Sequence, residues 1–88
     1  MISGKTESGF AFEIEDEALD DYDLLHALVQ VDRGDAAKIF DVVDLLLGEA
    51  QREALRDHVR TPSGRVSAKR MASEVAQIFK TCKEIKNS

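Results

Sequence analysis

The side chains that most often carry out chemistry in proteins are scarce in this 88-residue chain, which has two histidines, His26 and His58, and one cysteine, Cys82. A nucleophilic site needs a nucleophile, a base and a group that orients the base, and no such set stands out here. His26 lies in an apolar stretch, His58 near the expected end of a helix, and Cys82 on an apolar stripe. Such residues are usually structural. The sequence therefore predicts a protein that is not an enzyme.

The acidic segment 13–23 raises the question of a calcium site. Its acidic residues are Glu13, Glu15, Asp16, Glu17, Asp20, Asp21 and Asp23. An EF-hand loop alternates its ligands and needs a glycine at its sixth position, which this segment lacks. One cysteine and two distant histidines do not make a zinc site, and no glycine-rich phosphate loop is present. We therefore expect no metal or cofactor, and we expect these acids to begin a helix, where the helix dipole favours negative charge.

Arg52, Arg56 and Arg60 lie four residues apart and would share one face of a helix. Such a stripe can contact DNA phosphates, so a small DNA-binding or regulatory protein of the helix-turn-helix type is the alternative function. An acidic residue precedes each arginine by three positions, however, and ion pairs within the helix explain this spacing without a ligand. The formal net charge is −5. An acidic protein is repelled by a polyanion, and we do not expect a nucleic-acid partner.

The residues at the N-terminus predict a short β-hairpin over 1–15. Phe10, Phe12 and Ile14 alternate with polar or small residues, which is the pattern of a half-buried strand. Ser8-Gly9 reads as a turn, and residues 2–6 form the expected partner strand. An isolated hairpin is only marginally stable, so this one must dock on the rest of the chain or on another protein.

Residues 16–88 predict about four helices in a small bundle. We expect the first from an N-cap at Asp16 to about Asp32, the second from Asp35 to an interruption at Gly48, and the third from Glu49 to Arg60. A break at 61–64 precedes a fourth helix that begins near Ser67. Helical spacing gives three apolar stripes: Leu19, Tyr22, Leu25, Leu28 and Val29; then Ile39, Val42, Val43, Leu46 and Leu47; and finally Met71, Val75, Ile78, Cys82 and Ile85, with Phe79 beside them.

The periodicity therefore predicts a mainly α fold, and the length predicts a single domain, 1–88. The apolar fraction is 43% and the charged fraction 33%, a balance that is typical of soluble globular domains. No stretch approaches the about 20 apolar residues that a membrane span needs. Without a secretory signal, and with one cysteine, the chain is expected in the cytoplasm.

Three segments carry a resemblance to a known family. They are Gly9-Phe10-Ala11-Phe12-Glu13-Ile14, Glu17-Ala18-Leu19-Asp20-Asp21-Tyr22-Asp23-Leu24-Leu25, and Leu46-Leu47-Gly48-Glu49-Ala50-Gln51-Arg52-Glu53-Ala54-Leu55. Together the chain resembles the tail assembly chaperones of long-tailed, siphovirus-type bacteriophages and prophages. In that family a short strand with alternating apolar residues leads into an acidic helix, and a junction containing glycine and glutamine precedes the final helix. Gly48 and Gln51 match that junction.

The resemblance implies a non-enzymatic role in virion morphogenesis inside the host bacterial cell. Such chaperones bind the tape measure protein, keep it soluble, recruit tail tube subunits around it, and associate with themselves. We expect the partner contact on Phe10, Phe12 and Ile14 of the strand, or on Val75, Ile78 and Phe79 of the last helix. The alternative is that these six side chains simply fill the core, as most apolar residues of a small domain do.

Overall fold

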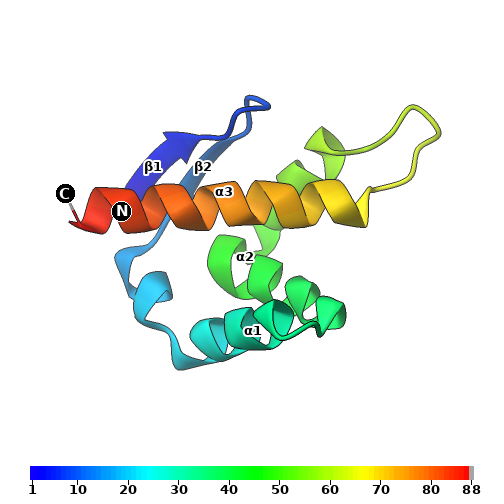
Figure 1. The fold of residues 1–88 in the computed structure, drawn as a ribbon. Helices are drawn as coiled ribbons and strands as arrows, with labels where there is room; N and C mark the ends of the chain where they lie inside the picture. Colours follow the sequence, from blue (N-terminus) through cyan, green and yellow to red (C-terminus); the bar gives the residue numbers. More distant parts are fainter. Residues whose placement is uncertain (88) are drawn as a thin grey trace.

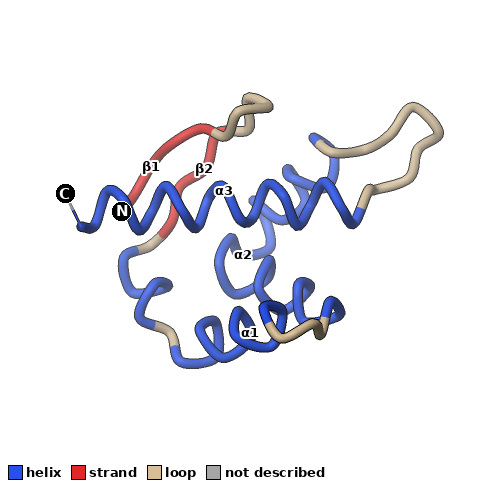
Figure 2. Tube along the Cα trace, in the orientation of Figure 1, coloured by secondary structure: helices blue, strands red, loops and turns tan. Residues whose placement is uncertain are grey.

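The computed structural model describes residues 1–87, with side chains as far as Ile85. The elements are strands β1 (Ile2–Lys5) and β2 (Ala11–Ile14), a 3₁₀ turn η1 (Asp16–Asp20), helix α1 (Tyr22–Asp32), a 3₁₀ turn η2 (Ala36–Lys38), and helices α2 (Ile39–His58) and α3 (Ala68–Asn87). Figures 1 and 2 show the mainly helical fold and its N-terminal hairpin, both of which confirm the prediction. The described chain has three α-helices, however, and not the expected four.

The hairpin is antiparallel and pairs Ile2 with Ile14 and Gly4 with Phe12. Its turn is closed by the Thr6 backbone N–H, which donates to the Phe10 carbonyl at 2.9 Å. The side chains of Phe12 and Ile14 are buried while Ala11 and Glu13 are exposed, as the period of two predicts. The hairpin docks on the helices, which supply the buried surface that two strands lack by themselves.

Helix α1 begins later than predicted. The segment after Asp16 forms the 3₁₀ turn η1, whose N-cap residue Glu15 makes no side-chain capping bond. The cap of α1 is Asp21, whose Oδ1 accepts from the backbone N–H groups of Asp23 and Leu24 at 2.8 and 3.3 Å. The acidic run offers several candidate caps, and the one that satisfies two helical N–H groups defines the start. The helix ends at Asp32, and Gly34 takes a left-handed φ of 103°.

Only part of the apolar stripe that was predicted for α1 meets the core, where Leu19 and Leu28 pack against the buried cluster. Leu24 and Ala27 are buried, whereas Tyr22, Leu25 and Val29 are 78, 41 and 46% exposed. Leu24 and Ala27 lie three positions apart and therefore share the face that packs toward the core. Helix α1 therefore has one apolar face inside the protein and a second one outside it.

The predicted second and third helices are joined as α2. Gly48 lies at the join with φ 76° and ψ 173°, so the glycine kinks the helix where an end was expected. This conformation is essentially restricted to glycine. The apolar residues before the kink, Val42, Val43, Leu46 and Leu47, face inward as predicted. Leu55 and Val59, which follow the kink, are buried as well.

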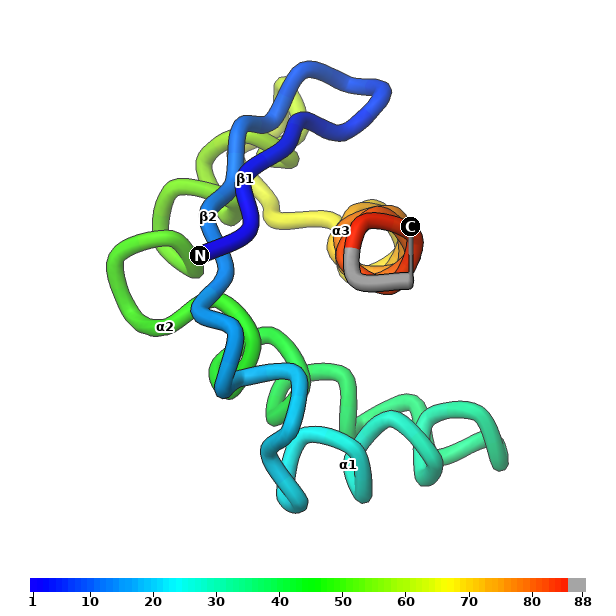
Figure 3. The backbone as a smooth tube through the Cα atoms, turned by 90° about the vertical axis from the view of Figure 1, so that its left-hand side faces the viewer, coloured from blue at the N-terminus to red at the C-terminus, as the bar shows by residue number. Residues whose placement is uncertain are grey.

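The break between α2 and α3 confirms the prediction for residues 61–64. An isolated bridge between Arg60 and Val66 closes this loop. Ser67 then caps α3, because its hydroxyl accepts from the backbone N–H of Arg70 at 3.2 Å. Figure 3 looks along α3 and shows the hairpin on one side of this helix and α1 on another.

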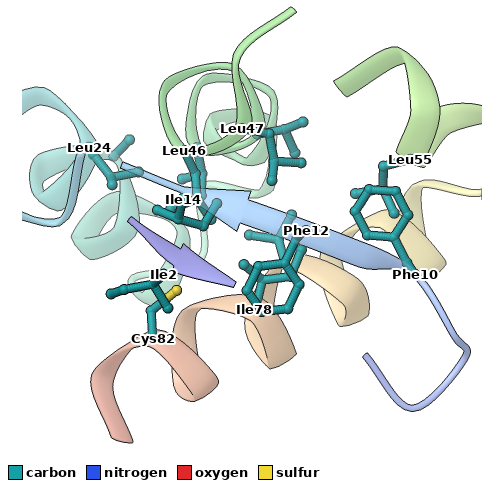
Figure 4. Packing of buried hydrophobic residues seen from close by; sticks show 14 of the residues in the cluster. Ile2, Phe10, Phe12, Ile14, Leu24, Leu46, Leu47, Leu55, Ile78 and Cys82 are labelled. Carbon is teal, nitrogen blue, oxygen red and sulfur yellow. The ribbon is translucent and has the colours of Figure 1, made fainter. Parts of the chain in front are cut away.

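One apolar cluster joins the hairpin to all three helices (Figure 4). Its most deeply buried large side chains are Ile14, Leu24, Leu55, Ile78, Val42, Val75 and Cys82. Burial of each large aliphatic side chain contributes about 1.5–3 kcal/mol, which is the main source of stability in a domain with so few aromatic residues. Within the described part of the chain, no helix is both long and apolar enough to cross a membrane.

Candidate partner-binding groove

The structure places five of the six predicted contact residues in the core. Phe10, Phe12, Ile14, Val75 and Ile78 are buried, and Phe79 is half-buried at the surface of α3. Figure 4 shows Phe10, Phe12, Ile14 and Ile78 directed into the cluster between the hairpin and the helices. In this conformation the five buried side chains stabilise the fold, and Phe79 is the one of the six with substantial surface open to a partner. The contact role of the other five stays a prediction that requires the hairpin or α3 to move.

An open apolar groove runs between α1 and α3. One hollow of about 990 Å³ is lined mainly by Leu28, Val31, Ile39, Ala72, Val75, Ala76 and Phe79. A second, of about 680 Å³, continues it past Leu19, Leu25 and Val29. The two hollows share Leu28, Asp32, Phe79 and Lys83, so they form a single groove. We call this the α1–α3 groove.

The α1 wall of this groove is the outward apolar face of that helix. Helix α1 directs Leu24 into the core and leaves Leu25 and Val29 on the groove side. The contacts of α1 are with α2 and the two 3₁₀ turns, and few join it to α3. An apolar wall without a facing neighbour is a surface on which another chain can bury its own apolar residues.

The α3 wall follows from the spacing of the last helix. Its inner residues Val75 and Ile78 contact the core, while Ala76 and Phe79 lie one position further round the helix and face the groove. Lys83 places its ammonium 5.9 Å from the centroid of the Phe79 ring, within the range of a cation–π contact. The groove thus has an apolar floor, and charged side chains lie along its edge.

A polar cluster at the tip of the hairpin was not predicted from the sequence. The Ser8 hydroxyl donates to Oε1 of Glu74, a carboxylate only 5% exposed, and it also bonds Nε2 of His58 at 2.9 Å. Thr6 Oγ1 accepts from the Phe10 N–H and lies 3.1 Å from the same hydroxyl. Because a hydroxyl has one proton, Thr6 and His58 must donate to Ser8, which places a proton on Nε2 of His58.

This cluster combines serine, histidine and a carboxylate, but its geometry is not that of a nucleophilic triad. In such a triad the carboxylate orients the imidazole, which in turn accepts the serine proton. Here Glu74 accepts directly from Ser8, and His58 donates. We interpret the cluster as a clasp that holds the hairpin against α2 and α3. Glu7 reinforces it, because its backbone N–H donates to Oε1 of Gln77 at 2.9 Å.

The arginine stripe that suggested DNA binding is engaged in ion pairs. Arg52 pairs with Asp44 at 3.1 Å, Arg56 with Glu53 at 3.1 Å, and Arg60 with Asp57 at 3.0 Å. The hydrogen bond that Arg52 donates to the Asp44 carboxylate raises the pKa of Arg52. Two of these pairs join residues three apart, as the sequence predicts. The charges of this face therefore compensate one another along α2.

The remaining reactive side chains lie apart from one another. His26 stacks on Tyr22 with 6.0 Å between the ring centroids, on the outer side of α1. Cys82 is buried between α3 and the hairpin, and burial raises the pKa of its thiol. Among the residues with described side chains, no group of three potential ligands is placed to hold a metal ion.

A signal for the groove was present in the sequence of α1. Seven of its eleven residues are apolar, namely Tyr22, Leu24, Leu25, Ala27, Leu28, Val29 and Val31. A helix that buries one face needs only about three or four apolar residues in two turns, so the surplus indicates a second apolar face. The α3 wall gave no comparable signal, since its groove residues adjoin the core stripe.

Comparison of the chain with models of protein families, with curated protein sequences and with solved structures gave no significant match.

Proposed function

We propose that this chain is a tail assembly chaperone of a long-tailed bacteriophage or prophage, which binds a helix of the tape measure protein in the α1–α3 groove. The observation that carries the proposal is the groove itself, an apolar channel open to solvent between two helices that hardly contact each other. The proposed role of the chain is non-enzymatic. The groove would shield apolar surface of the partner until assembly is complete.

The dimensions of the groove suit an amphipathic helix. At about 1.5 Å per residue, the stretch of α3 from Ala72 to Glu84 is about 18 Å long, which corresponds to three or four turns of a bound helix. Apolar side chains line both walls, so a helix with an apolar face at positions i, i+3, i+4 and i+7 would bury that face. A tape measure protein exposes many such faces before the tail tube surrounds it.

The three segments of the family resemblance are compatible with this proposal. The first forms the strand that fills the core, the second supplies the cap and the groove wall of α1, and the third holds the kink at Gly48. Recruitment of tail tube subunits and self-association are the further parts of the proposed role. Both need surfaces that stay free when the groove is filled.

Co-purification tests the proposal. The proposal predicts that a neighbouring gene encodes a very long, helix-rich protein. When the two proteins are co-expressed, we expect them to purify together. Val29→Asp on the α1 wall and Ala76→Asp on the α3 wall place a charge in the groove, and each should abolish the complex. Both positions are exposed, so the fold should persist.

Phe40→Asp is the matched control, because Phe40 is an exposed apolar residue that lines a different hollow. It should leave the complex intact. A complex that survives both groove variants, or that only Phe40→Asp disrupts, would show that the groove is not the binding site. Metabolic or regulatory neighbours in place of a long helix-rich gene would contradict the chaperone role.

DNA binding stays an alternative prediction, and nothing in the structure favours it over the pairing of Arg52, Arg56 and Arg60 with their own acids. A salt-sensitive shift of a DNA fragment at low ionic strength would support this alternative, and the Arg56→Gln variant should then weaken it. We expect no shift.

A further inference from the structure

The two rims of the α1–α3 groove carry different charges. Lys80 and Lys83 lie on the α3 rim with Glu84 beyond them, and Asp32 lies on the α1 rim. Within residues 1–85, none of these four side chains forms an ion pair. The arginines of α2 are paired with neighbouring acids, whereas the two lysines lie beside an apolar groove without an ion pair among the described side chains.

The position of the two lysines selects where an acidic partner binds. They are three residues apart and therefore share one side of α3. The whole chain has a net charge of −5, which repels an acidic helix in general. An approach to the α3 rim brings its carboxylates to these two cations beside the apolar groove. Lys83 lies over the apolar ring of Phe79, where a bound helix would exclude water.

We propose that the helix that fills the α1–α3 groove carries acidic residues along the flank that faces α3, spaced three or four apart so that they pair with Lys80 and Lys83. This inference rests on the proposed function, and it adds the charge that distinguishes the bound segment from other amphipathic helices of the same partner. A helix with a basic flank would bury its cations against the two lysines. Such repulsion rejects wrong segments as effectively as the pairing selects the right one.

Two synthetic peptides test the proposal directly. Both are amphipathic helices of about 14 residues with the same leucine and alanine face, and they differ only in having glutamate or lysine on the flanks. Fluorescence anisotropy at low salt should show at least tenfold tighter binding of the glutamate peptide to the wild-type chain. Added salt should weaken that binding, because exposed ion pairs are screened.

The double variant Lys80→Glu with Lys83→Glu should reverse the preference between the two peptides. Its matched control is Lys5→Glu with Lys69→Glu, which changes the net charge equally at exposed positions outside the groove lining. The control should keep the wild-type preference. Circular dichroism spectra and urea midpoints of all the variants establish that the fold is retained.

The outcomes separate this inference from the proposed function. Equal binding of both peptides, or an unchanged preference in the Lys80→Glu with Lys83→Glu variant, overturns the charge selection and leaves the groove as a helix-binding site. Failure of the long helix-rich protein to co-purify overturns the function itself. If the wild-type chain is a dimer that Val29→Asp converts to a monomer, and neither peptide binds, the occupant is a second copy and the inference is wrong.

Discussion

The side-chain amide of Gln51 on α2 pairs with the backbone of Glu13 in the way that a neighbouring strand would. Gln51 Oε1 accepts from the Glu13 N–H at 2.7 Å, and Gln51 Nε2 donates to the Glu13 carbonyl at 2.6 Å. The same Nε2 donates to the Leu47 carbonyl at 3.1 Å, beside the kink at Gly48. One side chain thus fixes the outer edge of β2 to the kinked helix.

The Gln51→Glu variant tests this connection. A carboxylate can accept from the Glu13 N–H, but it has no proton for the two carbonyl groups and repels them. We expect a loss of about 1–3 kcal/mol in the free energy of unfolding, measured with urea. Glu49→Gln, an opposite charge change at an exposed position of the same helix, should change stability by less than about 0.5 kcal/mol. Equal urea midpoints for Gln51→Glu and wild type would contradict the prediction.

Gly48→Ala should destabilise the fold through its backbone alone. An added Cβ would meet no atom within 4 Å, but φ 76° with ψ 173° is a conformation that alanine rarely adopts. The expected cost is about 1–3 kcal/mol. Gly4→Ala is an informative comparison, because there the backbone is ordinary and the new Cβ would lie 2.8 Å from Cζ of Phe12. A Gly48→Ala variant as stable as wild type would mean that α2 straightens without cost.

Ser8→Ala should destabilise the clasp between the hairpin and α3. It removes the donor to Glu74, whose other oxygen, Oε2, has no hydrogen-bond partner among the described residues. The expected loss is about 1–3 kcal/mol, because the buried carboxylate is left without a hydrogen bond. Adding Glu74→Leu should recover part of this loss, since both polar partners are then absent. Ser73→Ala, at an exposed position beside Glu74, serves as the control. Strictly additive effects of the two changes would argue against the clasp.

Stability should fall at alkaline pH because of Cys82. Burial raises the pKa of this thiol above its ordinary value of 9.0, so the unfolded chain loses its proton at a lower pH than the folded chain. The neutral Cys82 thiol makes its full contribution to stability below the ordinary pKa of a cysteine. This contribution is lost as pH rises through the higher pKa that Cys82 has in the folded chain. Urea titrations at pH 7.5 and 10 measure the loss. Cys82→Ala should show a smaller fall over this range, and an identical fall would exclude the thiol as the cause.

The local features of the fold were predictable from sequence, and the long-range ones were not. The alternation in the hairpin, the glycine at 48 and the cap at Ser67 depend on neighbours within a few positions, and the structure confirms them. The predicted number of helices was wrong because a glycine in the sequence can mark either a kink within a helix or the end of one. The predicted start of α1 was wrong because Asp16 and Asp21 are equally suitable N-cap residues when judged from the sequence.

The residues of the candidate site also divide into features that the local sequence predicts and features that depend on contacts between distant segments. Val75 and Ile78 were predicted as contacts from their apolar spacing, yet residues that pack inside and residues that bind a partner follow the same helical period. Which face of α1 meets the core depends on how α1 lies against α2, and the position of α3 depends on the hairpin. Such contacts join distant parts of the chain, so periodicity within one helix does not determine them.

The two faces of α1 have an evolutionary consequence. Leu24 and Ala27 are held by the core, so changes there cost stability, whereas Leu25 and Val29 are exposed and can change at little cost. The groove face is therefore free to diverge along with the helix that it binds. Relatives of this chain would keep the residues that shape the hairpin and the kink, while the residues of their binding faces diverge. The common fold would then persist after most of the sequence similarity is lost.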